Sequence, residues 1–328
     1  MLKKTTKENL LIVTRSTIYS NKSGGLETQL DNLISTLKSS YNITVLSTNI
    51  PDSPSLKLVE DSFSQILNSE NVKYIFLKNT ICGQYGFSLY ENLFWQIPFK
   101  HNYECLGKDF KKQSAKYFKE NLKGKFTKII SQSSSCQRFK INNENLFIIN
   151  HGTTLNEISN RKNSKLKIKD KIRFYFLDLP TLYYEYFINN PKLFKKAKSI
   201  ILVNHRLKKD FEIQHKEFLN KVKVIENSVD VEKFKYKEAT KDKLITYLGR
   251  LDVEKGVKDF LKVVKNFKNT KDLKFNLFGN GNLVNYIHKQ SLDSLQYGGE
   301  VDNIEVPKIL CKNDIFLFLT KRKEGMPM

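Results

Sequence analysis

Long apolar runs are absent from this sequence of 328 residues. A membrane-spanning helix needs about 20 consecutive apolar residues, and no such stretch occurs, so we expect no transmembrane helix. The apolar run Leu10–Val13 is too short for the central segment of a signal peptide and is not followed by a small-residue cleavage site. We therefore expect this run to be a buried strand.

Cysteine is also scarce, and its placement excludes the common cysteine-based sites. The four cysteines lie far apart, with neither CxxC nor any metal-ligand spacing; they are Cys82, Cys105, Cys136 and Cys311. This usage favours a reduced, cytoplasmic protein. A D-x-D metal motif, an internal repeat and a low-complexity linker are absent too, and we predict no metal site.

Acidic residues are few relative to basic ones, with 34 Asp and Glu against 56 Lys and Arg, which gives a net charge of +22. Such an excess favours anionic partners. It is also compatible with lysines scattered over a solvated surface, and both explanations stay open. No RNP, KH or zinc-finger pattern occurs and the lysines are spread along the whole chain, so we expect no nucleic-acid partner.

The sequence alternates apolar strands with amphipathic helices, which indicates an α/β protein with parallel sheets. Its first βαβ unit runs from Leu10–Val13 through a helix over Leu26–Leu37 to a strand over Tyr41–Ser47, and Gly24 and Gly25 precede the helix. Further strands are predicted at Val72–Leu77, Phe126–Ile130, Leu146–Ile149 and Ser199–Val203.

A second βαβ series follows a break near residues 227–232. Its strands are predicted at Leu244–Leu248, Lys274–Phe278 and Asp314–Thr320, and its helices at Val257–Phe267, Asn282–Gln290 and Val306–Cys311. We therefore predict two Rossmann-like domains, residues 1–227 and 228–328. Because the last predicted strand runs into a charged turn at the final residue, we expect the second domain to be incomplete.

The loop between the first strand and first helix of this second series has the composition of an anion site. It presents Arg250 and Lys255 just before a helix that begins near Gly256. A guanidinium grips phosphate through paired hydrogen bonds, an ammonium adds a point charge, and the helix N-terminus adds positive potential. The alternative is a surface loop with incidental charges.

Several short motifs, taken in order, resemble those of the retaining glycosyltransferases of family 4, which have the GT-B fold. The motifs of the second half are Asn227–Asp230, Gly249–Gly256, Gly279–Asn282, Asp314–Leu319 and Glu324–Pro327, and those of the first half are Gly24–Glu27 and His151–Thr153. The resemblance implies two Rossmann-like domains that face a cleft. The first would hold the acceptor and the second the nucleotide-sugar.

The resemblance also implies roles for individual residues. Glu324 and His151 would be catalytic, Glu324 by binding donor-sugar hydroxyls and His151 beside the donor sugar and the acceptor. Cations would replace a metal at the diphosphate leaving group, so no cofactor is required. The donor-binding residues would be Arg250, Lys255, Gly24, Gly25, Gly279, Gly281, Gly325 and Met326.

The implied activity is transfer of a sugar from a UDP- or GDP-sugar to a glycan or lipid-linked acceptor with retention at C1, in surface polysaccharide biosynthesis. The sequence departs from the family at Ser228, where the motif has glycine, and it contains no second Glu eight positions after Glu324. Two alternatives therefore remain: a truncated, non-catalytic remnant, or a sugar-nucleotide 2-epimerase of similar fold.

Two further segments have more than one interpretation. Lys108–Lys128 holds eight lysines and two acidic residues around four spaced apolar positions. It suits an anionic membrane surface, which would place the enzyme on the inner face of the plasma membrane, but a core-facing helix is favoured. The aromatic residues of 174–187 could stack on acceptor sugars, and core packing is favoured there. His205, His215 and His288 are expected at the surface.

Overall fold

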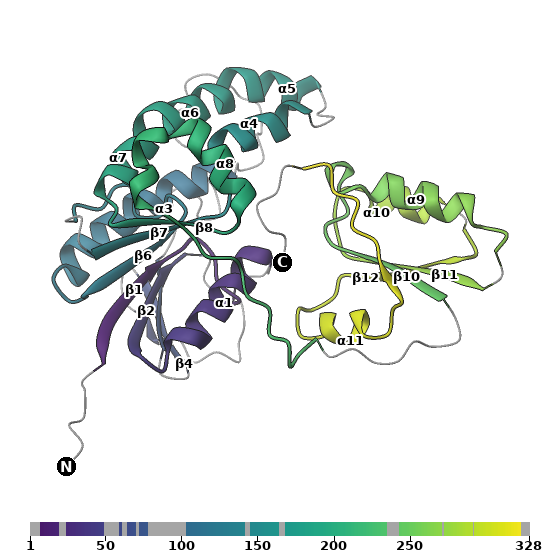
Figure 1. Cartoon of the computed structure of the whole chain (residues 1–328), viewed down its shortest axis with the longest axis horizontal. Coiled ribbons are helices and arrows are strands. Elements are labelled where there is room, and N and C mark those ends of the chain that lie inside the picture. The colour runs from purple at the N-terminus through teal and green to yellow at the C-terminus, as the bar shows by residue number, and fades with distance from the viewer. Residues whose placement is uncertain are drawn as a thin grey trace, which may run out of the picture. The chain divides into compact units, whose positions relative to one another are not determined.

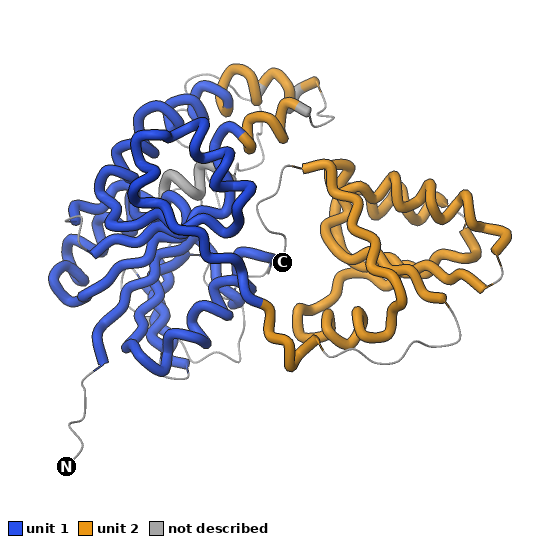
Figure 2. Tube along the Cα trace, viewed as in Figure 1, with its two compact units in different colours: residues 1–155, 179–228, 325–328 blue, residues 156–178, 229–324 orange. Residues whose placement is uncertain are grey.

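The computed structural model describes residues 7–19, 24–48, 59–60, 64–69, 72–77, 103–141, 145–163, 168–234, 243–270, 272–290 and 292–322. The chain forms two compact units (Figure 2), one from residues 1–155 and 179–228 and the other from 156–178 and 229–324. Each unit has its own apolar core. Within the described ranges, no helix has the length and apolar character needed to cross a bilayer.

The first unit is built on a nine-stranded sheet in the order β3-β4-β5-β2-β1-β6-β7-β8-β9 (Figure 1). Its strands are β1 (Glu8–Val13), β2 (Tyr41–Ser47), β3 (Val59–Glu60), β4 (Ser64–Ser69), β5 (Val72–Leu77), β6 (Lys128–Gln132), β7 (Leu146–Asn150), β8 (Ser199–Leu202) and β9 (Val222–Val224). All neighbours pair in parallel except β3 with β4 and β4 with β5. The predicted parallel α/β architecture is confirmed.

Burial explains why the central strands form. Leu10, Leu11, Ile12 and Val13 of β1 are at most 1% exposed, as expected for a parallel strand covered on both faces. The described α-helices between β1 and β9 are α1 (Gly25–Leu37), α3 (Tyr103–Tyr117), α4 (Thr154–Asn163), α5 (Ile168–Arg173), α6 (Leu179–Tyr184), α7 (Asn190–Lys196) and α8 (His205–Gln214). Of these, α5 belongs wholly to the second unit, as does α4 after its first two residues.

The strand order of the first sheet reverses between β1 and β6. From β1 the chain proceeds outward to β2 and β5, and it then returns to β6 on the other side of β1. Such a reversal leaves a crevice at the carboxyl ends of the two strands, where parallel α/β sheets bind their ligands. The loop before α1 and the end of β6 lie at this point.

The second unit has a four-stranded parallel sheet in the order β12-β11-β10-β13. Its elements are β10 (Lys243–Leu248), α9 (Val257–Asn266), β11 (Leu273–Phe278), α10 (Val284–His288), β12 (Leu295–Gly299), α11 (Val306–Leu310) and β13 (Ile315–Phe316). Helix α9 buries the apolar residues of one face: Val257, Phe260, Leu261 and Val264. The strand order reverses between β10 and β13, so this sheet also has a switch point.

The last strand is shorter and more exposed than predicted. The sequence predicted a buried strand over Asp314–Thr320, whereas β13 covers only Ile315–Phe316. Ile315, Phe316 and Phe318 are 50%, 47% and 42% exposed. The reason is that β13 pairs only with β10 and forms an edge of the described sheet. Strand β6 is also displaced, because it begins at Lys128 rather than Phe126.

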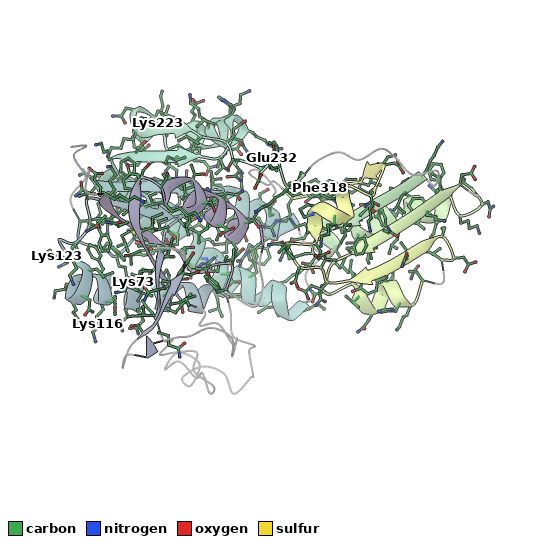
Figure 3. The ribbon with its side chains drawn as sticks, turned by 90° about the horizontal axis from the view of Figure 1, so that it is seen from below. Lys73, Lys116, Lys123, Lys223, Glu232 and Phe318 are labelled. Carbon is green, nitrogen blue, oxygen red and sulfur yellow. The ribbon has the colours of Figure 1, made fainter. Side chains whose placement is uncertain are left out.

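The lysine-rich segment folds as a core-facing helix, as favoured. Phe110, Phe118 and Leu122 of α3 and the following helical turn are buried, while Lys116 and Lys123 are exposed (Figure 3). The core-packing prediction for the aromatic segment is wrong for its most exposed members, Tyr175, Phe176, Tyr184 and Phe187, which are 51–76% exposed. Successive helical residues point about 100° apart, so consecutive aromatic residues cannot all share the buried face.

One histidine prediction is also wrong. His215 is buried rather than at the surface. Its ring packs among the rings of Tyr186, Phe194 and Phe211, with centroid separations of 5.1–5.2 Å. The helix α8 ends just before His215, and the ring packs against Phe211 of this helix.

Candidate functional site

Residues 249–256 join β10 to α9 and contain Arg250 and Lys255; we call them the basic loop. This loop lies at the switch point of the second unit's sheet. Strand β10 ends at Leu248, and Arg250 follows in the loop at the carboxyl end of the strand. Lys255 ends a short 3-10 turn, and Gly256, with a φ of 82°, is the N-cap of α9. The predicted arrangement of strand, basic loop and helix is therefore present. It places both cations in the segment that leads into α9, whose N-terminal end carries positive potential.

A buried tyrosine fixes the shape of this loop. The Tyr247 ring is 2% exposed, and its hydroxyl lies 3.1 Å from the carbonyl oxygens of both Arg250 and Lys255. The hydroxyl can donate its proton to either oxygen. The loop backbone at the two cations is thus tied to the core of the unit.

Carboxylates surround the Arg250 guanidinium. It lies 3.3 Å from Glu254 Oε1 and 3.6 Å from Asp252 Oδ2, and its side chain is 61% exposed. Glu254 Oε1 also accepts a hydrogen bond from Arg322 Nη1 at 2.6 Å. One carboxylate therefore serves two guanidinium groups. Exposed ion pairs of this kind contribute little free energy, so an incoming phosphate can compete for Arg250.

The segment after β13 lies against the same loop. The backbone N–H of Lys321 donates to the carbonyl of Glu254 at 2.9 Å. A side chain at Gly256 would place its first carbon 2.0 Å from the Leu319 carbonyl oxygen, so glycine permits this close approach. The predicted residues Glu324, Gly325 and Met326 lie outside the described residues.

The two predicted glycines of the next loop pack against the basic loop. Gly279 and Gly281 have φ values of 132° and 159°. Added side chains there would come within 1.9 Å of the Gly249 carbonyl oxygen and 2.8 Å of the Leu251 backbone. The structure thus brings the two glycines, Arg250 and Lys255 to one edge of the sheet. Both glycines have a packing role, independent of any ligand.

In the first unit, the predicted Gly24 and Gly25 begin helix α1. Gly24 is its N-cap and Gly25 its first residue. The Glu27 carboxylate accepts from the Gly24 N–H at 2.8 Å and from the Ser16 hydroxyl. This capping arrangement uses the Gly24 N–H. The N–H of Gly25 belongs to the first turn, where helical bonding leaves donors available.

His151 follows the end of β7 and is half-buried. Its Nε2 lies 2.6 Å from Oε1 of Gln132, the last residue of β6, which is 2% exposed. Burial lowers the pKa of His151 to about 4. The imidazole is therefore neutral at pH 7 and can accept or donate a hydrogen bond without carrying charge.

Sequence reasoning missed several residues of these sites. The capping role of Glu27 could have been predicted, because Glu27 is the last residue of the glycine motif at the start of α1. Tyr247 and Glu254 flank the basic loop, and their hydrogen bonds depend on how that loop folds. Gln132 gave no signal, since the strand was predicted to end at Ile130. Ser228, which departs from the family motif, causes no backbone strain: Ser133 alone among described non-glycine residues has a positive φ.

Within the described residues, no group of three His, Cys, Asp or Glu side chains could hold a metal ion. The thiol of Cys136 is buried, and burial raises its pKa to about 12. This cysteine is therefore a small apolar core residue rather than a nucleophile.

Solved structures with the same architecture identify the fold. Sucrose-phosphate synthase from Thermosynechococcus elongatus aligns over 98% of this chain and 77% of its own, with a TM-score of 0.65 and 11% identity. The catalytic domain of starch synthase IV from Arabidopsis thaliana, bound to ADP and acarbose, aligns over 96% and 78%, with a TM-score of 0.64 and 12% identity. Trehalose-6-phosphate synthase from E. coli, bound with UDP-2-fluoro glucose, aligns over 98% and 80%, with a TM-score of 0.55 and 12% identity. The chain has the GT-B glycosyltransferase fold.

Sequence comparison adds a family match for the second part of the chain. Residues 228–328, less than half of the chain, match the family "Glycosyl transferases group 1". A curated relative from Klebsiella pneumoniae, described as an uncharacterized 41.2 kDa protein in the cps region, is 32% identical over 108 residues. The match spans 30% of this chain and only 30% of that relative.

Proposed function

We propose that this chain transfers a sugar from a UDP- or GDP-sugar to a glycan or lipid-linked acceptor, with retention of configuration at C1, in the synthesis of a surface polysaccharide. The proposal extends the family of residues 228–328 to a specific reaction. The cps-region relative supports the polysaccharide context. The ADP and UDP-sugar complexes of proteins with this fold support a nucleotide-linked donor.

The observation that carries the proposal is the position of Arg250 and Lys255. Both lie at the switch point of a parallel sheet, beside the first turn of α9. Negative charge develops on a nucleoside diphosphate as its bond to the sugar breaks, and cations fixed at that point lower the barrier. In the proposed mechanism these two side chains hold the diphosphate without a metal ion, and Glu324 binds the donor sugar.

Donor binding tests this proposal directly. Isothermal titration should show that UDP or GDP binds the full chain. Arg250→Ala and Lys255→Ala should each weaken binding and lower turnover of the matching sugar nucleotide by more than about tenfold. Lys268→Ala is the matched control, because it removes the same charge from the turn beyond the other end of α9. The proposal fails if neither nucleotide binds, or if all three variants behave like the wild type.

We further propose that the first unit associates with an anionic membrane surface through charge alone. The lysine-rich segment Lys108–Lys128 has exposed lysines that include Lys112, Lys116, Lys119, Lys123 and Lys125 (Lys116 and Lys123 are labelled in Figure 3). Of the four spaced apolar side chains of the same segment, Phe110, Phe118 and Leu122 are buried and Phe126 is partly buried against the core, so they are not available for insertion. Each lysine near an anionic surface contributes about 1 kcal/mol.

Co-sedimentation with vesicles tests this second point. Binding to vesicles with anionic lipid should fall in high salt and in a Lys116→Glu, Lys119→Glu, Lys123→Glu variant, and should be absent with neutral vesicles. Salt-independent binding would contradict an electrostatic association. No binding to anionic vesicles would remove the membrane from the proposal and leave the donor chemistry untouched.

A further inference from the structure

Three side chains form a hydrogen-bonded chain at the switch point of the first sheet. Gln29 is on α1, Gln132 ends β6, and His151 follows β7. Gln132 Nε2 donates to Gln29 Oε1 at 2.9 Å, and Gln132 Oε1 lies 2.6 Å from His151 Nε2. These bonds connect the helix after the glycine loop to the histidine, across the ends of three neighbouring elements.

Gln132, the middle of the three residues, sets the direction in which the two hydrogen bonds are donated. A glutamine amide has two donors on its nitrogen and acceptor positions only on its oxygen. Because the Gln132 nitrogen faces Gln29, its oxygen faces the imidazole and can only accept. With the Gln132 amide in this orientation, the proton between Gln132 and His151 resides on His151 Nε2. The other ring nitrogen, Nδ1, is then left with a lone pair.

The backbone at the end of β6 is shaped to hold Gln132 in this orientation. Ser133 has a φ of 50°, the single described non-glycine residue in the left-handed region. Its N–H donates to the Ile149 carbonyl at 2.8 Å, and its carbonyl accepts from the Ser131 hydroxyl at 2.9 Å. Strained positions held by several bonds are typical of functional sites.

We propose that Gln132 is a positioning residue that holds His151 as its Nε2–H tautomer, so that Nδ1 is the ring atom that accepts a hydrogen bond from the sugar acceptor. The reference to the acceptor rests on the proposed glycosyl transfer. The tautomer itself does not, since it follows from the hydrogen-bond chain within the free protein. In this arrangement His151 orients a hydroxyl group rather than removing its proton.

The low pKa of His151 agrees with this role, because burial keeps the ring neutral at the pH of the cell. A protonated ring would donate from both nitrogens and could not accept. Burial ensures that the ring carries a single N–H proton, and Gln132 selects the nitrogen that carries it.

Nitrogen NMR of the uniformly labelled full chain tests the tautomer without any substrate. Long-range proton–nitrogen spectra at pH 7 distinguish Nε2, which couples to both carbon-bound ring protons, from Nδ1. The His151 signals are identified by their loss in His151→Gln. The wild type should show a protonated Nε2 and an unprotonated Nδ1. A protonated Nδ1 in the wild type would overturn the proposal, whatever the variants do.

Substitutions separate positioning from packing. Gln132→Leu removes the acceptor, and Gln29→Leu removes the partner that orients it, so both should move His151 toward a mixture of tautomers. Gln132→Glu keeps an acceptor and should retain the Nε2 proton, while raising the pKa at which His151 titrates. Gln290→Leu makes the same chemical change in the second unit and should leave His151 unchanged. An unaltered tautomer in folded Gln132→Leu would overturn the proposal.

Kinetics link the tautomer to transfer. Gln132→Leu should lower kcat at least several-fold with little change in the KM of the donor, and Gln132→Glu should restore kcat with a shifted pH profile. If the NMR result holds but no sugar nucleotide reacts, the proposed function fails while the positioning inference stands. If transfer proceeds equally in Gln132→Leu, the positioning role fails while the proposed function stands.

Discussion

A methyl group on Gly279 would lie 1.9 Å from the carbonyl oxygen of Gly249. The two glycines join the loops after β11 and β10, where the Gly249 N–H also donates to the Phe278 carbonyl at 3.1 Å. The backbone of the basic loop can therefore adopt this conformation only because the residue beside it, Gly279, has no side chain.

Gly279→Ala should consequently destabilise the second unit. A positive φ already disfavours alanine, and the contact with Gly249 adds steric overlap, so we expect a loss of more than about 2 kcal/mol. Gly299→Ala is the matched control. Gly299 also has a positive φ, of 75°, but open space around it, so about 1 kcal/mol is expected. Urea unfolding measures both, and equal losses would show that the overlap is relieved by a small shift.

Tyr247 offers a separate test of the basic loop. Tyr247→Phe keeps the buried ring and removes only the hydroxyl that reaches the carbonyls of Arg250 and Lys255. The lost hydrogen bond should cost about 1 kcal/mol. Because the loop backbone is released, UDP or GDP affinity should fall as well, by a few-fold. Tyr286→Phe, on a 39% exposed ring, is the control, and matching affinities in the two variants would argue against a positioning role for Tyr247.

Replacing Ser133 with glycine should leave the protein as stable or make it more stable, although the same replacement would destabilise most other positions. Its φ of 50° costs a residue with a side chain about 1–2 kcal/mol, whereas glycine loses about 0.5–1 kcal/mol of chain entropy. Ser133→Gly should therefore be neutral or stabilising by up to about 1 kcal/mol. Ser134→Gly, one residue on and without a positive φ, should be destabilising by about 0.5–1 kcal/mol. Thermal unfolding compares them, and the same sign for both would exclude strain at Ser133.

Three neighbouring strands of the first sheet were predicted from sequence almost to the residue. Strands β2 and β5 occur at the predicted residues, and β1 differs only at its first two. In β1 and β5 the apolar runs Leu10–Val13 and Tyr74–Leu77 are continuous, because the sheet buries both of its faces there. Strands β9 and β12 were not predicted, since their residues are only partly buried and carry no such pattern.

The candidate sites divide along a similar line. Arg250 and Lys255 were predicted because an anion site in a loop before a helix is a local feature. The pairing of Glu254 with Arg322 joins residues 68 positions apart, and no local pattern reports it. The position of Gln132 depends on the register of β6 against β1 and β7. Its bond to His151 therefore became visible only in the folded chain.

The free energy of unfolding should depend on pH through His151. Burial lowers the pKa of this histidine from 6.5 to about 4 in the folded chain, while the unfolded chain takes up a proton near its ordinary pKa. The unfolded state therefore binds more protons between these values. The stability contribution of neutral His151 is complete above about pH 6.5 and is lost as the pH falls toward 4.

Comparison with His151→Gln isolates this effect. The variant lacks the titrating ring. The unfolding free energy of the wild type minus that of His151→Gln should therefore be constant between pH 7 and 8, and it should decrease as the pH falls below about 6.5. His215, whose pKa burial also lowers and Glu217 partly restores, is present in both proteins and cancels. An NMR titration of the His151 ring should give a midpoint near 4 in the same range. A midpoint near 6.5, with a pH-independent difference, would show that the ring is solvated in the folded chain.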